Sequence, residues 1–123
     1  MKTYEDRPFK DVCELELKAR EICGNLFERG WDDYGIVERV LAKAFLADWS
    51  SERTAQEWVN LAEILENVTL SEVDYAQDPL MALDDRLKKA FKRMVREGYL
   101  YSRTSRGKRY YGLSLQSNSE AVA

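Results

Sequence analysis

The chain has 123 residues, of which 45% are apolar and 11% are aromatic, and this is enough for one domain with a hydrophobic core. Its 19 basic and 22 acidic side chains leave a net charge of −3. The absence of histidine excludes a Ser-His-Asp triad, a Cys-His pair and imidazole metal ligands. We therefore expect a protein that is not an enzyme and that needs no metal or cofactor.

The sequence gives no sign of a membrane segment. No apolar run approaches the roughly 20 residues that cross a bilayer. The first residues, MKTYEDRPFKD, carry acids where a signal peptide has its apolar stretch. We expect a cytoplasmic protein that does not associate with membranes.

The first predicted helix runs from about Lys10 to Arg29, because apolar residues recur at spacings of three and four and Gly30 suits the C-terminal cap. Cys13 and Cys23 both fall on it, and a rise of about 1.5 Å per residue separates them by roughly 15 Å. A disulfide between them is excluded at that distance. Two free, half-buried thiols are the expected state.

Two more helices follow. The second extends from Asp32 or Asp33, which we interpret as capping residues, to about Asp48, and its wide apolar arc indicates a central position. The third covers Glu52 to about Glu66, with Ser50 or Ser51 as its predicted cap. The three tryptophans are expected in the core, as is usual in small helical domains; they are Trp31, Trp49 and Trp58.

After Asn67, the pattern predicts a very short strand at 68–70 and a short helix at 70–76. Asp78 and Pro79 then form a cap with proline in the first helical position, which predicts a helix from Leu80 to about Glu97. One side of this helix is apolar. The other carries six basic residues, Arg86, Lys88, Lys89, Lys92, Arg93 and Arg96.

Two β-rich runs follow Gly98 and predict a hairpin. They cover 99–103 and 108–115, and the turn between them, 104–107, includes a glycine that can take a positive φ. Tyr111, Leu113 and Leu115 alternate, so one face of the hairpin should be buried. The remaining residues, 117–123, lack a pattern and are expected to be frayed.

Basic and acidic side chains are distributed unevenly along the chain. Residues 1–80 contain 9 basic and 18 acidic side chains, whereas residues 81–123 contain 10 basic and 4 acidic ones. A net-acidic protein with one concentrated basic surface can still bind DNA, because the local patch displaces the counterions.

The stretch RLKKAFKRMVREGYLYSRTSRGKRYYGLS resembles the third helix and wing of bacterial winged helix-turn-helix regulators of the MarR and PadR kind. The resemblance covers about residues 52–115. It implies a mainly α fold with a small β-hairpin, in which two additional N-terminal helices (1–50) precede a winged helix (51–116) within a single domain.

In such regulators the third helix enters the major groove of DNA and the wing reaches phosphates or the minor groove. The resemblance implies ten DNA-binding residues, with Arg86, Lys89, Lys92 and Arg93 facing solvent and Arg86 reading bases. The ten are Arg86, Lys88, Lys89, Lys92, Arg93, Arg96, Arg103, Arg106, Lys108 and Arg109.

The chain departs from this family in two ways. Asp84 and Asp85 lie in the half of the helix where bases are usually read, and acids there more often repel the phosphate backbone of DNA. We also expect this chain to lack the usual C-terminal dimerisation helix, so a homodimer would have to form through residues 10–50. Two functions stay open: a small DNA-binding transcriptional regulator, or an adaptor in which the same fold binds a protein partner.

Overall fold

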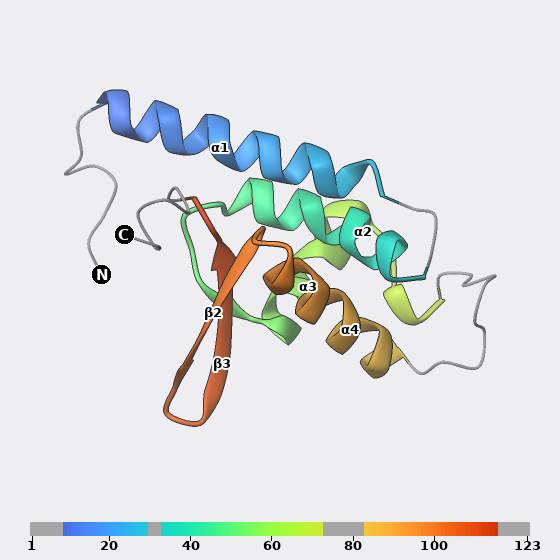
Figure 1. Ribbon diagram of the computed structural model, residues 1–123. Helices are drawn as coiled ribbons and strands as arrows, with labels where there is room; N and C mark the ends of the chain where they lie inside the picture. Colours follow the sequence, from blue (N-terminus) through green and yellow to red (C-terminus); the bar gives the residue numbers. More distant parts are fainter. Residues whose placement is uncertain (1–8, 30–32, 73–82, 116–123) are drawn as a thin grey trace.

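The computed structural model describes residues 9–29, 33–72 and 83–115. Four α-helices and a small antiparallel sheet make up this part of the chain (Figure 1), so the prediction of a mainly α protein with a β-hairpin is confirmed. None of the described helices is long and apolar enough to span a membrane.

The two N-terminal helices, α1 (Phe9–Phe27) and α2 (Asp33–Ala47), lie side by side. The inner side of α1 is fully apolar and buried, which explains why the helix keeps a spacing of three and four; it presents Ala19, Ile22, Cys23 and Leu26. Helix α2 contacts α1, α3 and α4, so its predicted central position is confirmed. Cys13 is half-buried, Cys23 is buried, and both thiols are free, as expected.

The connection after α2 differs from the prediction. Asp48 accepts hydrogen bonds from Ser51 Oγ (2.7 Å) and from Arg53 Nε (2.8 Å), which closes the turn. A short strand, β1 (Arg53–Thr54), follows, and α3 (Ala55–Glu66) then begins. Its cap is Thr54, whose hydroxyl accepts from Glu57 N, and not Ser50 or Ser51, because Ser51 is already used by Asp48.

The strand predicted at 68–70 is wrong. Asn67 takes a left-handed conformation (φ 53°) and ends α3, and Leu70–Glu72 then forms a single 3₁₀ turn, η2. The third strand of the sheet is β1, which precedes α3. The start proposed for the basic helix at Asp78 and Pro79, and the end of the short helix at 70–76, lie outside the described residues.

The hairpin consists of β2 (Leu100–Ser105) and β3 (Lys108–Leu113), which follow α4 (Leu83–Arg96). β3 lies in the middle of the sheet, with the order β1-β3-β2. The turn contains only Arg106 (φ 53°) and Gly107 (φ 78°), shorter than the predicted 104–107. Two successive positive φ angles are those of a type I′ turn, whose twist matches that of the strands.

An aromatic cluster joins the helices to the sheet. The Phe45 ring lies edge-on to Trp58 (4.8 Å between centroids) and to Phe91 (6.3 Å), and Phe91 contacts Tyr111 of β3 (4.6 Å). The buried Trp58 indole donates to the Tyr111 carbonyl at 2.9 Å. Trp58 is therefore a core residue as predicted, Trp49 packs against the core, and Trp31 lies outside the described residues.

Candidate nucleic-acid interface

Packing of α4 determines which of its basic residues reach solvent. Leu87, Ala90, Phe91 and Met94 are buried against α2 and the sheet. Residues on the opposite side of the helix are exposed, as predicted; the basic ones are Lys88, Lys89, Lys92 and Arg96. We call these four residues the α4 cations.

Two arginines of the predicted interface do not face solvent. Arg86 is buried, with 5% of its surface exposed, and the side chain of Arg93 is only 18% exposed. Both belong to the row of positions 86, 90, 93 and 97, and this row faces α2 and not solvent. The prediction that Arg86 and Arg93 are solvent-facing is therefore wrong.

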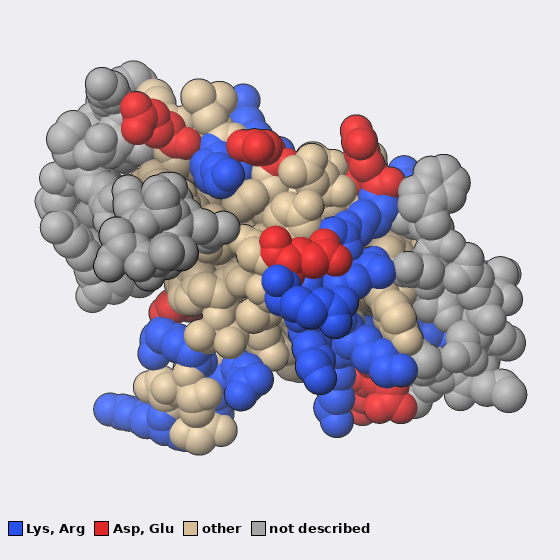
Figure 2. Space-filling view, viewed as in Figure 1, with Lys and Arg blue, Asp and Glu red and all other residues tan. Residues whose placement is uncertain are grey.

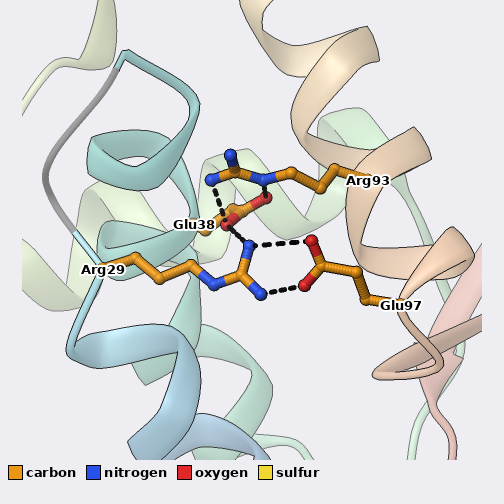
Figure 3. A network of polar contacts seen from close by, with 4 residues as sticks. All are labelled: Arg29, Glu38, Arg93 and Glu97. Carbon is orange, nitrogen blue, oxygen red and sulfur yellow. Dashed lines mark hydrogen bonds and ion pairs between the residues drawn. The ribbon is translucent and has the colours of Figure 1, made fainter.

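Arg93 belongs to a network of four charged residues (Figure 3). Its Nε and Nη2 donate to the two carboxylate oxygens of Glu38 on α2, each at 2.9 Å, and Arg29 Nη1 donates to Glu38 Oε1 at 2.7 Å. Arg29 also pairs with Glu97, directly after α4. Glu38 itself has no solvent exposure. The guanidinium groups of Arg29 and Arg93 thus compensate the buried carboxylate of Glu38. The carboxylate of Glu97 balances the remaining positive charge, so the network of four side chains is neutral.

The sequence contains a signal for this network. Glu38 stands four residues after Tyr34 and three before Leu41, in line with Phe45, and so on the apolar side of its helix. A carboxylate in that position needs a charged partner on another element. The sequence does not identify the partners, because Arg29, which follows α1, and Arg93 of α4 meet Glu38 only in the folded chain.

The hairpin carries four basic residues of the prediction, and one of them is already paired. Arg103 Nε donates to Glu52 at 2.8 Å, and Tyr101 Oη donates to the same carboxylate at 2.6 Å. The hydrogen bond from Arg103 holds the pKa of Glu52 below its usual value and raises the pKa of Arg103. Arg106, Lys108 and Arg109 are exposed, as expected of the wing. We call these three residues the hairpin cations.

Strand alternation distributes the hairpin side chains between two faces. Arg109 is paired across the strands with Thr104 and shares a face with Tyr111, the residue that contacts Phe91 of α4. Lys108 lies on the other face, together with Tyr110 and Arg103, whose guanidinium is 5.2 Å from the Tyr110 ring centroid. Arg109 is therefore the hairpin cation on the same side of the sheet as α4.

Basic side chains gather over α4 and over the hairpin in one view of the molecule (Figure 2). Asp84 and Asp85 are exposed in the first turn of α4, the end of the helix farther from the hairpin (Figure 1). Carboxylates there stabilise the helix through its dipole. They flank the α4 cations without separating them from the hairpin cations.

Among the residues that the structure describes, no group of three or more Cys, Asp or Glu side chains could hold a metal ion. A comparison with known proteins finds no matching family model, no matching curated protein and no matching solved structure. Function must therefore be inferred from the geometry of the chain itself.

Proposed function

We propose that this chain is a winged-helix DNA-binding protein that uses α4 as its recognition helix and β2 and β3 as its wing. The order of helix, short strand, helix, basic helix and hairpin supports this fold, as does the pairing of β1 with the second strand of the hairpin. The observation that carries the proposal is the exposure of the α4 cations and the hairpin cations on two adjacent elements, in a chain that is acidic elsewhere.

The burial of Arg86 and Arg93 changes how such a protein would read DNA. Three of the four α4 cations are lysines, which act as point charges on phosphate, whereas arginine forks read guanine edges. Arg96, near the C-terminal end of α4, is the exposed arginine of this helix. We infer that phosphate contacts dominate affinity and that discrimination between base sequences is weak, as suits an architectural protein or a regulator with few base contacts.

Binding to a random-sequence DNA duplex, titrated from low to physiological salt, tests the proposal. We expect the affinity of the native protein to fall steeply with salt, because each phosphate contact releases counterions. Neutralising Lys88, Lys89 and Lys92 to Gln should lower the affinity for all sequences and flatten the log–log salt slope by up to about 0.9 for each lost contact. Neutralising Arg106 and Lys108 together should act in the same way.

The matched control for the Arg106 and Lys108 variant replaces the same number of cations, Lys18 and Lys43 on other helices, with Gln. That variant changes net charge without touching α4 or the hairpin, so its salt slope should equal that of the native protein. Equal losses in the control and in the hairpin variant would mean that binding follows net charge alone.

A second function, a protein adaptor, is favoured by a separate observation. Ile64 is 76% exposed at the C-terminal end of α3, and Leu65 and Val68 beside it are also exposed. Apolar side chains gathered in this way are typical of protein contact sites. No DNA binding even at low salt would overturn the DNA proposal and leave the adaptor as the better explanation.

A further inference from the structure

The outer side of α1 has an organisation that the DNA proposal does not use. Leu17, Arg20, Gly24 and Phe27 follow one another at spacings of three, four and three, and all four are exposed. They form one row along the helix outside the side that packs on α2. Phe27, at one end of the row, borders α2, where Arg39 lies over its ring. Leu17 is 64% exposed and Phe27 is 39% exposed. We call this row the α1 seam, and its spacing is that of helices that pack along one another.

Gly24 is the unusual member of the α1 seam. Glycine inside a helix costs about 1 kcal/mol relative to alanine. A Cβ at position 24 would meet no atom within 4 Å, and its φ is not positive, so nothing within the described chain requires glycine there. Close approach of a second backbone from outside the chain would give glycine a role there.

Charges beside the α1 seam are self-complementary. Arg20 pairs with Glu16 one turn earlier at 3.3 Å, with both side chains largely exposed, and such a pair contributes little. Glu21 and Glu28 are exposed on either side of Gly24. Gly24 and these two acids therefore make a notch with a carboxylate at each end. Glu21 pairs with Lys18 on the same helix at 3.7 Å, but both side chains stay largely exposed, so its carboxylate can also accept from a cation on another helix. Arg20 of an identical helix supplies such a cation.

We propose that α1 docks against α1 of a second copy of this chain, antiparallel, about a two-fold axis that passes between Arg20 and Gly24. Leu17 then packs on Phe27 of the second copy, and Arg20 lies over its Gly24 between its two carboxylates. Because the axis is two-fold, each contact occurs twice. Phe27 is accessible for this role although Arg39 covers one part of its ring, with 4.6 Å between the guanidinium and the centroid.

The area of the interface limits its strength. A helix of 19 residues is about 28 Å long at about 1.5 Å per residue, and one such helix pair buries less than the roughly 1,600 Å² of a standard interface. A weak dimer is therefore expected, with a dissociation constant on the order of micromolar. This proposal is independent of DNA binding.

Sedimentation equilibrium of the full chain over a range of concentrations tests the proposal. The native protein should dimerise. Gly24→Ala should raise the dissociation constant roughly tenfold or more, because a methyl group overfills the contact. The same change should raise the melting temperature of the monomer, since alanine is the better helix former. Asn25→Ala, at an exposed position beside the seam, is the matched control and should leave the dissociation constant unchanged.

A charge exchange gives a second, positive test. Arg20→Glu should dissociate the dimer, because it places a third carboxylate in the notch. Adding Glu21→Arg and Glu28→Arg in the same chain should restore association, because the notch then has a cation at each end for the new carboxylate. A native chain that stays monomeric throughout, a Gly24→Ala dimer as strong as the native one, or a charge exchange that restores nothing would each overturn the proposed contact.

Discussion

At the scale of single residues, burial decides what a side chain can do, and Cys23 gives the clearest example. The thiol lies on the inner side of α1, and desolvation raises its pKa from 9.0 to about 12. At neutral pH it therefore remains a thiol and behaves as a small apolar side chain. Its contribution to the core depends on that protonated state.

We expect Cys23 to make the folded state less stable at alkaline pH. Between about pH 9 and 12 the folded protein keeps the thiol proton while the unfolded chain releases it, so the unfolded state binds fewer protons. The free energy of unfolding then falls as pH rises, by up to about 1.4 kcal/mol per pH unit. Below pH 9 this contribution is fully present. Urea denaturation between pH 8 and 11 measures the slope.

The variant that isolates this effect is Cys23→Ala, which should flatten the slope. Ile22→Val is its control, because it removes a buried methyl group one residue away and should lower stability by about 1 kcal/mol at every pH. An alkaline slope that is equally steep in Cys23→Ala and in the native protein would mean that other groups cause it.

At the scale of elements, the hairpin has its own locking contacts. Tyr101 lies directly across the strands from Gly112, and its ring covers the glycine. A Cβ at position 112 would lie 2.8 Å from the Tyr101 ring. An aromatic ring over a cross-strand glycine is a known way to stabilise a strand that contains one. The Tyr101 hydroxyl also donates to Glu52, so ring and hydroxyl both fix the base of the hairpin.

Gly112→Ala should destabilise the protein by about 1–3 kcal/mol, because the added methyl group collides with a ring that is held at both ends. The cost should fall in the double variant Tyr101→Ala with Gly112→Ala, since the collision is then absent. Urea denaturation of the native protein, both single variants and the double variant gives the coupling energy. Additive losses would show that Gly112 is required for another reason.

At the scale of the whole molecule, the Glu38 network connects elements that are distant in the sequence. Arg29 follows α1, and Glu38 is in the middle of α2. Arg93 lies in the last turn of α4, and Glu97 follows that helix directly. The acidic N-terminal helices are thereby attached to the basic helix through buried charge. Breaking a buried ion pair costs far more than breaking a surface pair, because the remaining charge stays desolvated.

Glu38→Gln should therefore lower the free energy of unfolding by about 3–5 kcal/mol, even though the two side chains have nearly the same shape. Glu66→Gln breaks the Lys43 to Glu66 surface pair and should cost less than about 1 kcal/mol. Urea denaturation at neutral pH compares the two. Equal losses would contradict the view that burial of the carboxylate gives the network its importance.

Local patterns were sufficient for much of the fold. Apolar spacing predicted α1, α2, α3 and the described part of α4, and strand alternation with a glycine turn predicted the hairpin. The prediction of a strand at 68–70 was wrong, because the third strand of the sheet is β1, which precedes α3. β1 has only two residues, Arg53 and Thr54, and its conformation depends on pairing with β3. No local pattern marks so short a strand. The cap of α3 was placed early for a related reason, since Ser51 bonds to Asp48 instead.

The candidate interface shows the same limit. Lys88, Lys89, Lys92 and Arg96 could be assigned to an exposed surface from helical spacing alone. Spacing alone could not place Arg86 and Arg93, because both lie at the border of the apolar side of α4. At such a border a guanidinium group can either reach solvent or pair with a carboxylate of another element. Glu38 decides the matter for Arg93, and it lies 55 residues away in sequence.

The sequence by itself determined the helical class, the hairpin, and the concentration of basic charge after residue 80, because each depends on neighbouring residues and on short-range spacing. Only the tertiary structure decided which basic residues remain at the surface. Desolvation makes a buried charge stable only where an opposite charge meets it, and that meeting depends on how α1, α2 and α4 pack together.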